Sequence, residues 1–304
     1  MNTSIRIRYG LRTLLLSTIC AAIVAAVICE KVSIAYRERR AISKLRTLEA
    51  LIVYGEANQT PHNPITFGQG NAERLENRLT PDSGVARQVY FLSFLSRYSN
   101  TIYIGVDDLA VLQSLPELDT LVLSGTNVTD SHLRHIVDLP NLRDLRLCRT
   151  QVSDSGVGLL RKTQRLTRLS LSGTAITDDG LKHLKSLRRL RELDLSNTGV
   201  TDLGMQYVSC ALELQVLNLS GTNITDSGVA QLRRLKELRH LDVSYTKLTE
   251  RAVTYLREFD QLHELMMSGV SVNNTAFDRL TQMTTLTFVR HDETFWYRPS
   301  KSER

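Results

Sequence analysis

A hydrophobic pattern that repeats every 24 residues runs through the second half of the chain. Rows of 24 residues starting at Leu118, Leu142, Leu166, Leu190, Leu214, Leu238 and Leu262 align without an insertion. Position 4 of every row is leucine, position 6 is leucine, valine or methionine, and position 11 is always aliphatic. An internal repeat of this length predicts a repeat architecture instead of one globular core.

Each row combines two periodicities. Positions 4 and 6 alternate with polar positions, which predicts a short strand, whereas positions 16 and 19, such as Leu181 and Leu184, have the spacing of one helix face. One row cannot bury its own leucines, so neighbouring rows must stack. We therefore predict an α/β fold: a solenoid over residues 118–285, with a parallel inner sheet and outer helices.

The rows also resemble a known family. LSGTAITDDGLKHLKSLRRL (residues 171–190) and LSGTNITDSGVAQLRRL (residues 219–235) are similar to the 24-residue leucine-rich repeat, written LxxLxLsgTxITDxGLxxLxxL. This resemblance covers 168 of the 304 residues and implies a horseshoe-shaped solenoid. The N-terminal arrangement resembles that of membrane-anchored leucine-rich-repeat proteins of planctomycete-type bacteria. Related repeats occur in internalin-like surface proteins and in F-box proteins, although no F-box is recognisable here.

The N-terminus carries an apolar segment. Residues 13–29 (TLLLSTICAAIVAAVIC) contain no charge and follow three arginines. With snorkelling of Arg12 and Lys31, this length just spans a bilayer core. A buried core helix is the alternative, but the solenoid needs no helix that is apolar all round. We predict a single-pass transmembrane helix or signal anchor, in a bacterial inner membrane.

Processing and orientation of this segment are less constrained. Ser33, Ile34 and Ala35 have the small-residue spacing of a signal-peptidase site, but Glu30 and Lys31 separate them from the apolar run, which favours an uncleaved anchor. Both flanks are basic, so the side of the membrane that holds the repeats stays open. Nine Lys or Arg against three acids before residue 50 suit anionic lipid headgroups.

The remaining segments complete the predicted organisation. We expect an amphipathic helix from residue 31 to 51, a short strand at 51–54, a loop at 58–71, a helix from Pro81 through Val85, Val89 and Phe91, and a strand at Ile102 and Ile104. Leu109, Leu112 and Leu115 would stand behind that strand as a shortened first repeat. The predicted divisions are a basic tail (1–12), the apolar segment (13–29), a charged helix and connector (30–80), an N-terminal cap with a degenerate repeat (81–117), seven repeats (118–285) and a C-terminal strand with a capping tail (286–304). In that tail, Phe295, Trp296 and Tyr297 would cover the open end of the core.

Three columns of residues recur for structural reasons. Thr126, Thr150, Thr174, Thr198, Thr222 and Thr246 would tie down the turn after each strand. Asp130, Asp154, Asp178, Asp202 and Asp226, with the Thr or Ser before them, would cap their own helices. Calcium binding is the alternative for a row of acids, but one acid per repeat at a cap position favours capping. The glycines at position 15 would serve close packing at the helix start.

Variation concentrates on the outward side of the strands, at positions 3, 5 and 8. The candidate binding residues there are Arg146, Arg149, Arg168, Glu192, Asp194, Asn218, His240, Asp242, Tyr245 and Glu264. The arginines fall toward one end and the acids toward the other, which predicts a dipolar concave strip. The alternative is a face that is merely solvated, but a rigid concave sheet suits a partner.

Nothing in the sequence indicates catalysis. CxxC, HExxH, GxSxG and GxxxxGK[ST] are absent, and His132, His135 and Asp138 on one helix face suit a surface better than a metal site, so no cofactor is expected. Basic runs near 161, 182–189 and 233–236 lack interleaved aromatics, which argues against nucleic acid. We also expect no disulfide. The sequence thus predicts a non-catalytic protein that binds an unknown protein or envelope polymer; a structural or self-associating envelope protein is the alternative.

Overall fold

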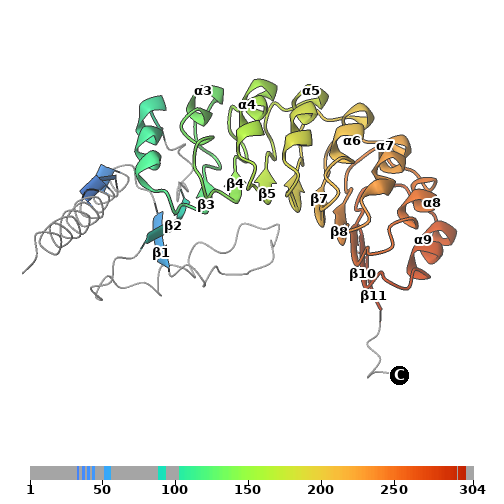
Figure 1. Ribbon diagram of the computed structural model, residues 1–304. Helices are drawn as coiled ribbons and strands as arrows, with labels where there is room; N and C mark the ends of the chain where they lie inside the picture. Colours follow the sequence, from blue (N-terminus) through green and yellow to red (C-terminus); the bar gives the residue numbers. More distant parts are fainter. Residues whose placement is uncertain are drawn as a thin grey trace, which may run out of the picture.

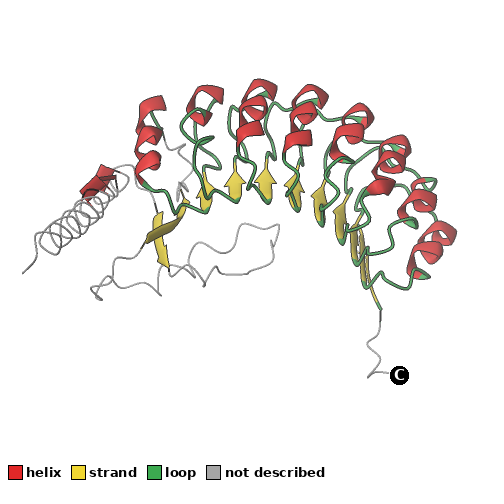
Figure 2. Ribbon diagram, viewed as in Figure 1, coloured by secondary structure: helices red, strands yellow, loops and turns green. Residues whose placement is uncertain are grey.

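The repeats form one curved solenoid, with strands along the inner side and helices along the outer side (Figure 1). This computed structural model describes residues 103–292 and 294–298 in full, the backbone of 51–55 and 88–93, and residues 33, 36–37, 40–41 and 43–44. Figure 2 shows that a short strand, a loop and a helix alternate along the arc. The concave surface is therefore made of strands, as the repeat pattern predicts.

The strands of the described residues join into one sheet in chain order. They are β1 (Leu51–Gly55), β2 (Gln88–Ser93), β3 (Thr120–Val122), β4 (Asp144–Arg146), β5 (Arg168–Ser170), β6 (Glu192–Asp194), β7 (Val216–Asn218), β8 (His240–Asp242), β9 (Glu264–Met266), β10 (Phe288–His291) and β11 (Thr294–Tyr297). Pairing is parallel from β2 to β10 and antiparallel at the two ends. Leu121, Leu145 and Leu169 stand opposite one another, so each position pairs with the same position of the next row.

Each row also contributes one short α-helix, several of which end in a 3-10 turn. The helical segments are η1 (Val106–Ser114), α3 (Asp130–Leu133), α4 (Asp154–Leu159), η2 (Leu160–Lys162), α5 (Asp178–Leu181), η3 (Lys182–Ser186), α6 (Asp202–Val208), α7 (Asp226–Gln231), η4 (Leu232–Arg234), α8 (Ala252–Leu256) and α9 (Asn274–Thr281). The leucines at positions 4 and 6 and the aliphatic residues facing them from the helices form one continuous buried core. The stacking predicted from the rows is confirmed.

The first repeat differs from the prediction. Val89 and Phe91 lie in β2, so the helix expected through them is wrong. The spacing of Val85 and Val89, four residues apart, fits one face of a helix, but the run QVYFLS fits a strand equally well. Phe91 pairs with Thr120, 29 residues later, so this repeat is longer than the others, not shorter. Ile104 is not in a strand, and its backbone is bonded instead by the Asn127 side chain, at 2.7 and 3.0 Å.

The predicted amphipathic helix, 31–51, is helical at its described positions up to residue 44, whereas Leu51 begins β1. Ala41 is buried against the core, and Lys44 Nζ lies 2.9 Å from Asp108 Oδ1, so this helix packs beside η1. The strand expected at 51–54 is confirmed as β1. The predicted membrane segment, 13–29, lies outside the described residues. Within the described part of the chain, no helix has the length and apolar character needed to cross a bilayer.

At the other end, β10 and β11 form a hairpin that finishes the sheet. Trp296 packs against the core opposite Val289, and the Arg298 guanidinium donates to the carbonyls of Leu286 and Thr281, at 3.0 and 3.2 Å. Trp296 therefore contributes to the predicted cap. Phe295 and Tyr297 do not cover the core, because they point to the opposite face of the hairpin and are exposed.

Candidate binding surface on the concave sheet

The turn after each strand is fixed by a threonine. The Thr174 hydroxyl donates to the carbonyl of Leu171 at 2.6 Å, and the Thr126 hydroxyl donates to that of Leu123 at 2.7 Å. The same bond recurs in the following rows of this column. The predicted structural role of these threonines is confirmed.

The aspartate column links neighbouring repeats instead of capping its own helices. Asp178 Oδ1 accepts the Thr201 backbone N–H at 2.9 Å, and Asp178 Oδ2 accepts the Thr201 hydroxyl at 2.6 Å. The capping is done by the threonine, since Thr201 Oγ1 accepts the Leu203 N–H. The other members of the ladder pair Asp130 with Ser153, Asp154 with Thr177, Asp202 with Thr225 and Asp226 with Thr249. This carboxylate ladder makes the sheet a rigid support.

The glycines at position 15 make room for the ladder. A Cβ on Gly180 would stand 2.5 Å from Asp154 Oδ1, so a side chain here would displace that carboxylate. In the row of Thr249 the α-helix begins two positions later, and Ala252 takes this place beside the Asp226 link. The first row has no aspartate before it and carries His132 at this position. His132 is buried, and its Nδ1 accepts the Thr129 N–H at 3.1 Å while Nε2 contacts the Ile104 carbonyl at 3.1 Å. The surface role predicted for His132 is therefore wrong. Among the described residues, no three potential ligands gather around a metal position.

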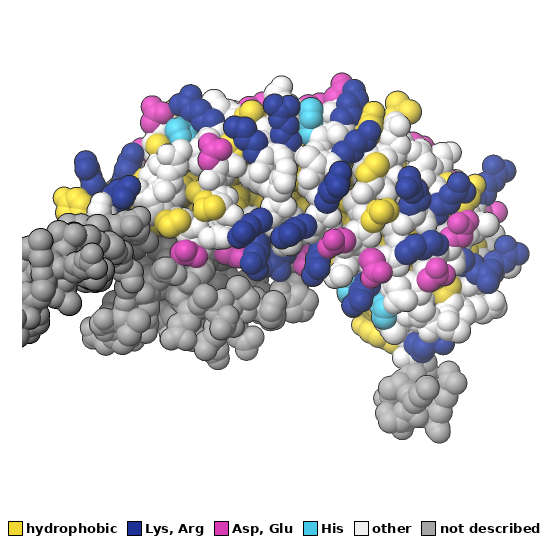
Figure 3. All heavy atoms as spheres, in the orientation of Figure 1, with side chains coloured by type: hydrophobic (Ala, Val, Ile, Leu, Met, Phe, Trp, Pro, Cys, Tyr) yellow, Lys and Arg dark blue, Asp and Glu magenta, His cyan; other side chains and the backbone are white. Residues whose placement is uncertain are grey.

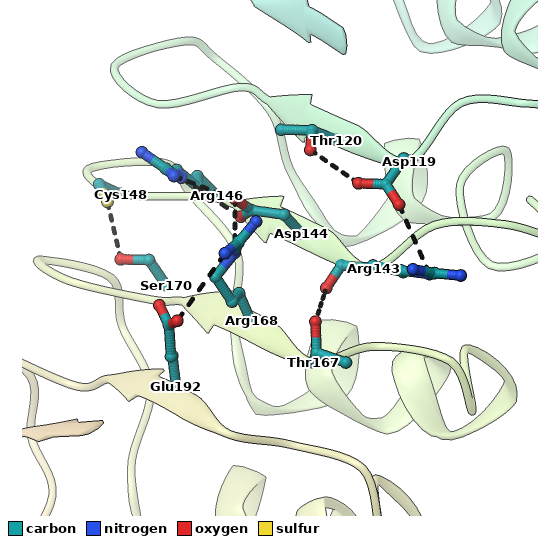
Figure 4. Close-up of polar contacts among 10 residues, drawn as sticks. All are labelled: Asp119, Thr120, Arg143, Asp144, Arg146, Cys148, Thr167, Arg168, Ser170 and Glu192. Carbon is teal, nitrogen blue, oxygen red and sulfur yellow. Dashed lines mark hydrogen bonds and ion pairs between the residues drawn. The ribbon is translucent and has the colours of Figure 1, made fainter. Parts of the chain in front are cut away.

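Two arginines at the predicted basic end of the concave strip share one buried acid (Figure 4). Asp144 is 1% exposed and accepts two bonds from Arg146, at 3.2 and 3.0 Å, and one from Arg168, at 3.1 Å. Arg168 Nη1 also lies 3.8 Å from Glu192 Oε1. Burial opposes the charge of Arg146, but the bonds to Asp144 outweigh it and raise the pKa of Arg146. Arg146 and Arg168 share this one buried acid, which weakens the positive charge of this end, and the dipolar strip stays a prediction.

The acids farther along are also engaged with their surroundings. Asp194, Asn218 and Asp242 each accept the N–H of the serine two residues later, at 2.9 to 3.0 Å. Burial raises the pKa of Asp242 despite its bonds from Ser244. Burial likewise raises the pKa of Glu192, although Arg168 opposes the shift. These side chains hold the sheet together as well as facing its concave side.

His240 and Glu264 form a separate pair, with 2.9 Å between Nδ1 and Oε2. Both side chains stay partly exposed on adjacent strands of the concave sheet. The pair lies on β8 and β9; β8 adjoins β7, which carries Asn218, and is three strands away from β5, which carries Arg168. The structure therefore spreads the predicted residues over several small groups along the sheet.

Position 8 forms a rim at the turn that follows each strand. Arg149, Asn197 and Tyr245 have left-handed backbones, with φ of 52°, 55° and 56°, and the alternate rows carry glycine. Each large side chain lies over the glycine of the next row, since a Cβ on Gly269 would stand 2.7 Å from Tyr245 Cδ1. Tyr245 is 70% exposed, and Arg149 makes no ion pair with another described residue. Of the predicted site, these two are the most accessible.

The sequence prediction missed an aromatic patch at the C-terminal end of the sheet. Phe288, Phe295 and Tyr297 stand together, with ring centroids 6.3 and 4.9 Å from that of Phe288, and Arg290 lies over the Phe295 ring. The tail FWY was assigned to capping as a block. The alternation of a strand would have separated Trp296 from its two neighbours.

The outer layer carries basic side chains without forming one basic patch. On the face shown in Figure 3, lysines and arginines are spread over several repeats with acids between them. Some are paired, such as Lys236 with Asp260 at 3.6 Å and Arg191 with Glu213 at 3.5 Å. The prediction that these runs are solvated helix faces remains a prediction.

Comparisons with known proteins agree with this geometry. Two family models, both described as leucine rich repeat, match residues 164–185 and 188–248. The solenoid is built of leucine-rich repeats. No curated protein matches the sequence. The cysteines described here, Cys148 and Cys210, are free thiols, so this domain is held by its core and its ladder.

Solved structures with a similar fold include two internalins of Listeria monocytogenes. One, internalin InlF, is 22% identical with a TM-score of 0.51, over 67% of this chain and 55% of its own. The other, internalin C2, is 21% identical with a TM-score of 0.52, over 67% of this chain and 80% of its own. This chain therefore spans about half of the first internalin. At this identity the likeness shows the leucine-rich-repeat fold alone.

Proposed function

We propose that this chain is a non-catalytic, membrane-anchored protein that binds another protein or an envelope polymer through its concave sheet and the adjoining rim. The observation that carries the proposal is the backbone at Arg149 and Tyr245. A non-glycine residue at positive φ costs about 1 kcal/mol or more, and the alternate rows avoid that cost with glycine. Large exposed side chains kept at a strained position suit recognition better than folding.

The anchor is the second part of the proposal. The uncharged run 13–29 and its basic flanks support a single-pass helix in a bacterial inner membrane. Such an anchor would hold the solenoid at the membrane surface. Reporter fusions at the C-terminus would establish on which side the repeats lie. The anchor itself is tested by fractionation of the full-length chain, which should stay with the membrane after an alkaline carbonate wash; recovery in the wash would contradict the anchor.

The binding surface is tested with Arg149→Gly and Tyr245→Gly, separately and together, in the full-length chain in mild detergent. Glycine relieves the left-handed backbone, so these variants are expected to fold at least as well as the parent. We expect the double variant to lose saturable capture from solubilised envelope fractions of the source organism. Arg161→Ala on the outer surface is the matched control and should retain capture. Unchanged stoichiometric capture by the double variant would contradict the assignment.

A further inference from the structure

The outer edge of β11 offers unpaired backbone groups. Arg298 N–H donates to the Thr287 carbonyl at 3.0 Å, so these two residues form a hydrogen-bonded pair at the end of the β10–β11 ladder. Hydrogen-bonded and non-hydrogen-bonded pairs alternate along an antiparallel ladder, so this one bond determines the type of every other pair. The N–H and C=O of Trp296 therefore face β10, and those of Phe295 and Tyr297 face outward. Within the described residues, no strand pairs with this edge. The sheet thus ends on a row of donors and acceptors.

The same strand exposes large apolar side chains. Phe295 is 55% exposed and Tyr297 is 66% exposed, both on the concave side of the hairpin. Natural edge strands are usually protected by lysine, proline or a bulge, and β11 (TFWY) has none of these. An exposed aromatic edge of this kind is a template for another strand.

We propose that two copies of this chain pair through β11, antiparallel and around a two-fold axis beside Trp296. Phe295 of each copy then stands opposite Tyr297 of the other, which joins the outward donors and acceptors in four hydrogen bonds. Both aromatic side chains meet aromatic side chains on the concave face, and the two Trp296 rings adjoin on the core side. The sheet continues from one solenoid into the other.

Charge favours a second copy in this orientation. Asp292 precedes β11 and Arg298 follows it, so antiparallel pairing brings the acidic end of one strand beside the basic end of the other. A parallel pairing would place like charges together. The edge is therefore complementary to itself, and a two-fold interface needs this property. This proposal goes beyond concave binding and does not depend on it.

The first test is sedimentation velocity of the full-length chain in mild detergent over a concentration series. We expect a monomer–dimer equilibrium whose dissociation constant rises at least tenfold in Phe295→Lys and Tyr297→Lys, because each places a charge in the interface. Tyr103→Lys makes the same change at an 80% exposed tyrosine near the other end and should leave the equilibrium unchanged. A monomer at every concentration, or a dimer that the β11 variants do not weaken, would overturn the proposal.

The second test measures the register, in a chain whose four cysteines are replaced by serine. Opposed residues 295 and 297 of a hydrogen-bonded pair lie about 5.5 Å apart between Cα atoms, within disulfide range. Mild oxidation should therefore link Phe295→Cys to Tyr297→Cys when the two variants are mixed, and link neither variant to itself. Self-linked products, or no link in the mixture, would refute this register. Arg149→Gly with Tyr245→Gly should leave both results unchanged.

Discussion

The carboxylate ladder predicts a specific energetic coupling between Asp154 and Gly180. Asp154 accepts the Thr177 N–H at 2.8 Å and the Thr177 hydroxyl at 2.6 Å. Each bond contributes about 1 kcal/mol, so Asp154→Ala should cost about 2 kcal/mol of unfolding free energy. The three nearest atoms to a Cβ on Gly180 all belong to Asp154, and the nearest of them is the carboxylate oxygen that accepts the N–H.

Gly180→Ala should therefore act through the same carboxylate. Its methyl group displaces Oδ1 and loses the two bonds, about 2 kcal/mol, while alanine regains about 1 kcal/mol of helix propensity. The single variant then costs about 1 kcal/mol. In the double variant the carboxylate is already absent, and the methyl group meets only the Cα of residue 154, at 3.2 Å, which a small shift accommodates. We therefore expect a total cost of about 1 kcal/mol, against about 3 kcal/mol if the effects added.

Urea unfolding followed by circular dichroism measures all four corners of this cycle. The comparison requires equal slopes, because a change of slope in a repeat protein signals loss of cooperativity instead of a change in stability. Gly158→Ala is the control, since its Cβ would meet only the ring of His183 at 3.2 Å, which can move. Additivity of the two substitutions to within about 0.5 kcal/mol would refute the ladder as the reason for glycine at position 15.

Two further predictions concern His132 and Asp242. His132→Gly removes the imidazole that contacts the Ile104 carbonyl just before η1, so hydrogen exchange at residues 106–114 should accelerate, whereas His183→Gly in η3 should leave it unchanged. Burial raises the pKa of Asp242, so the folded chain keeps that proton to higher pH than the unfolded chain, which titrates near 3.8, and stability falls as pH rises between the two values. Asp242→Asn keeps the acceptor for Ser244 N–H, as Asn218 does for Ser220. In urea unfolding from acid to neutral pH, this variant should therefore lose the fall in stability; an unchanged or steeper fall would contradict the role of Asp242.

The fold was predictable because every row repeats the same local signals. Leucines at fixed positions determine which side of each strand is buried, and seven identical periods leave no choice of register. Prediction failed where the period breaks. Between Phe91 and Thr120 the spacing is 29 residues, so the row pattern could not indicate that Val89 and Phe91 belong to a strand.

The candidate site was predictable only as a set of positions. The sequence placed Arg146 and Arg168 on the concave face, but it could not show that both reach the same buried Asp144. The aspartate column looked like helix capping because the sequence shows neighbours along the chain. Its real partners stand 23 residues away in the next repeat, and only the superhelical stacking brings them together.

The alternation at position 8 restricts how such a solenoid can change its length. Arg149 lies over Gly173, Asn197 over Gly221 and Tyr245 over Gly269, so the packing unit along the rim is two repeats. Deleting one glycine-bearing row would bring two of these side chains side by side, whereas deleting a row that carries one of them would leave two adjacent glycines, which the backbone tolerates. Losses of a single row in this solenoid should therefore remove the row of Arg149, Asn197 or Tyr245 and keep the rows with glycine.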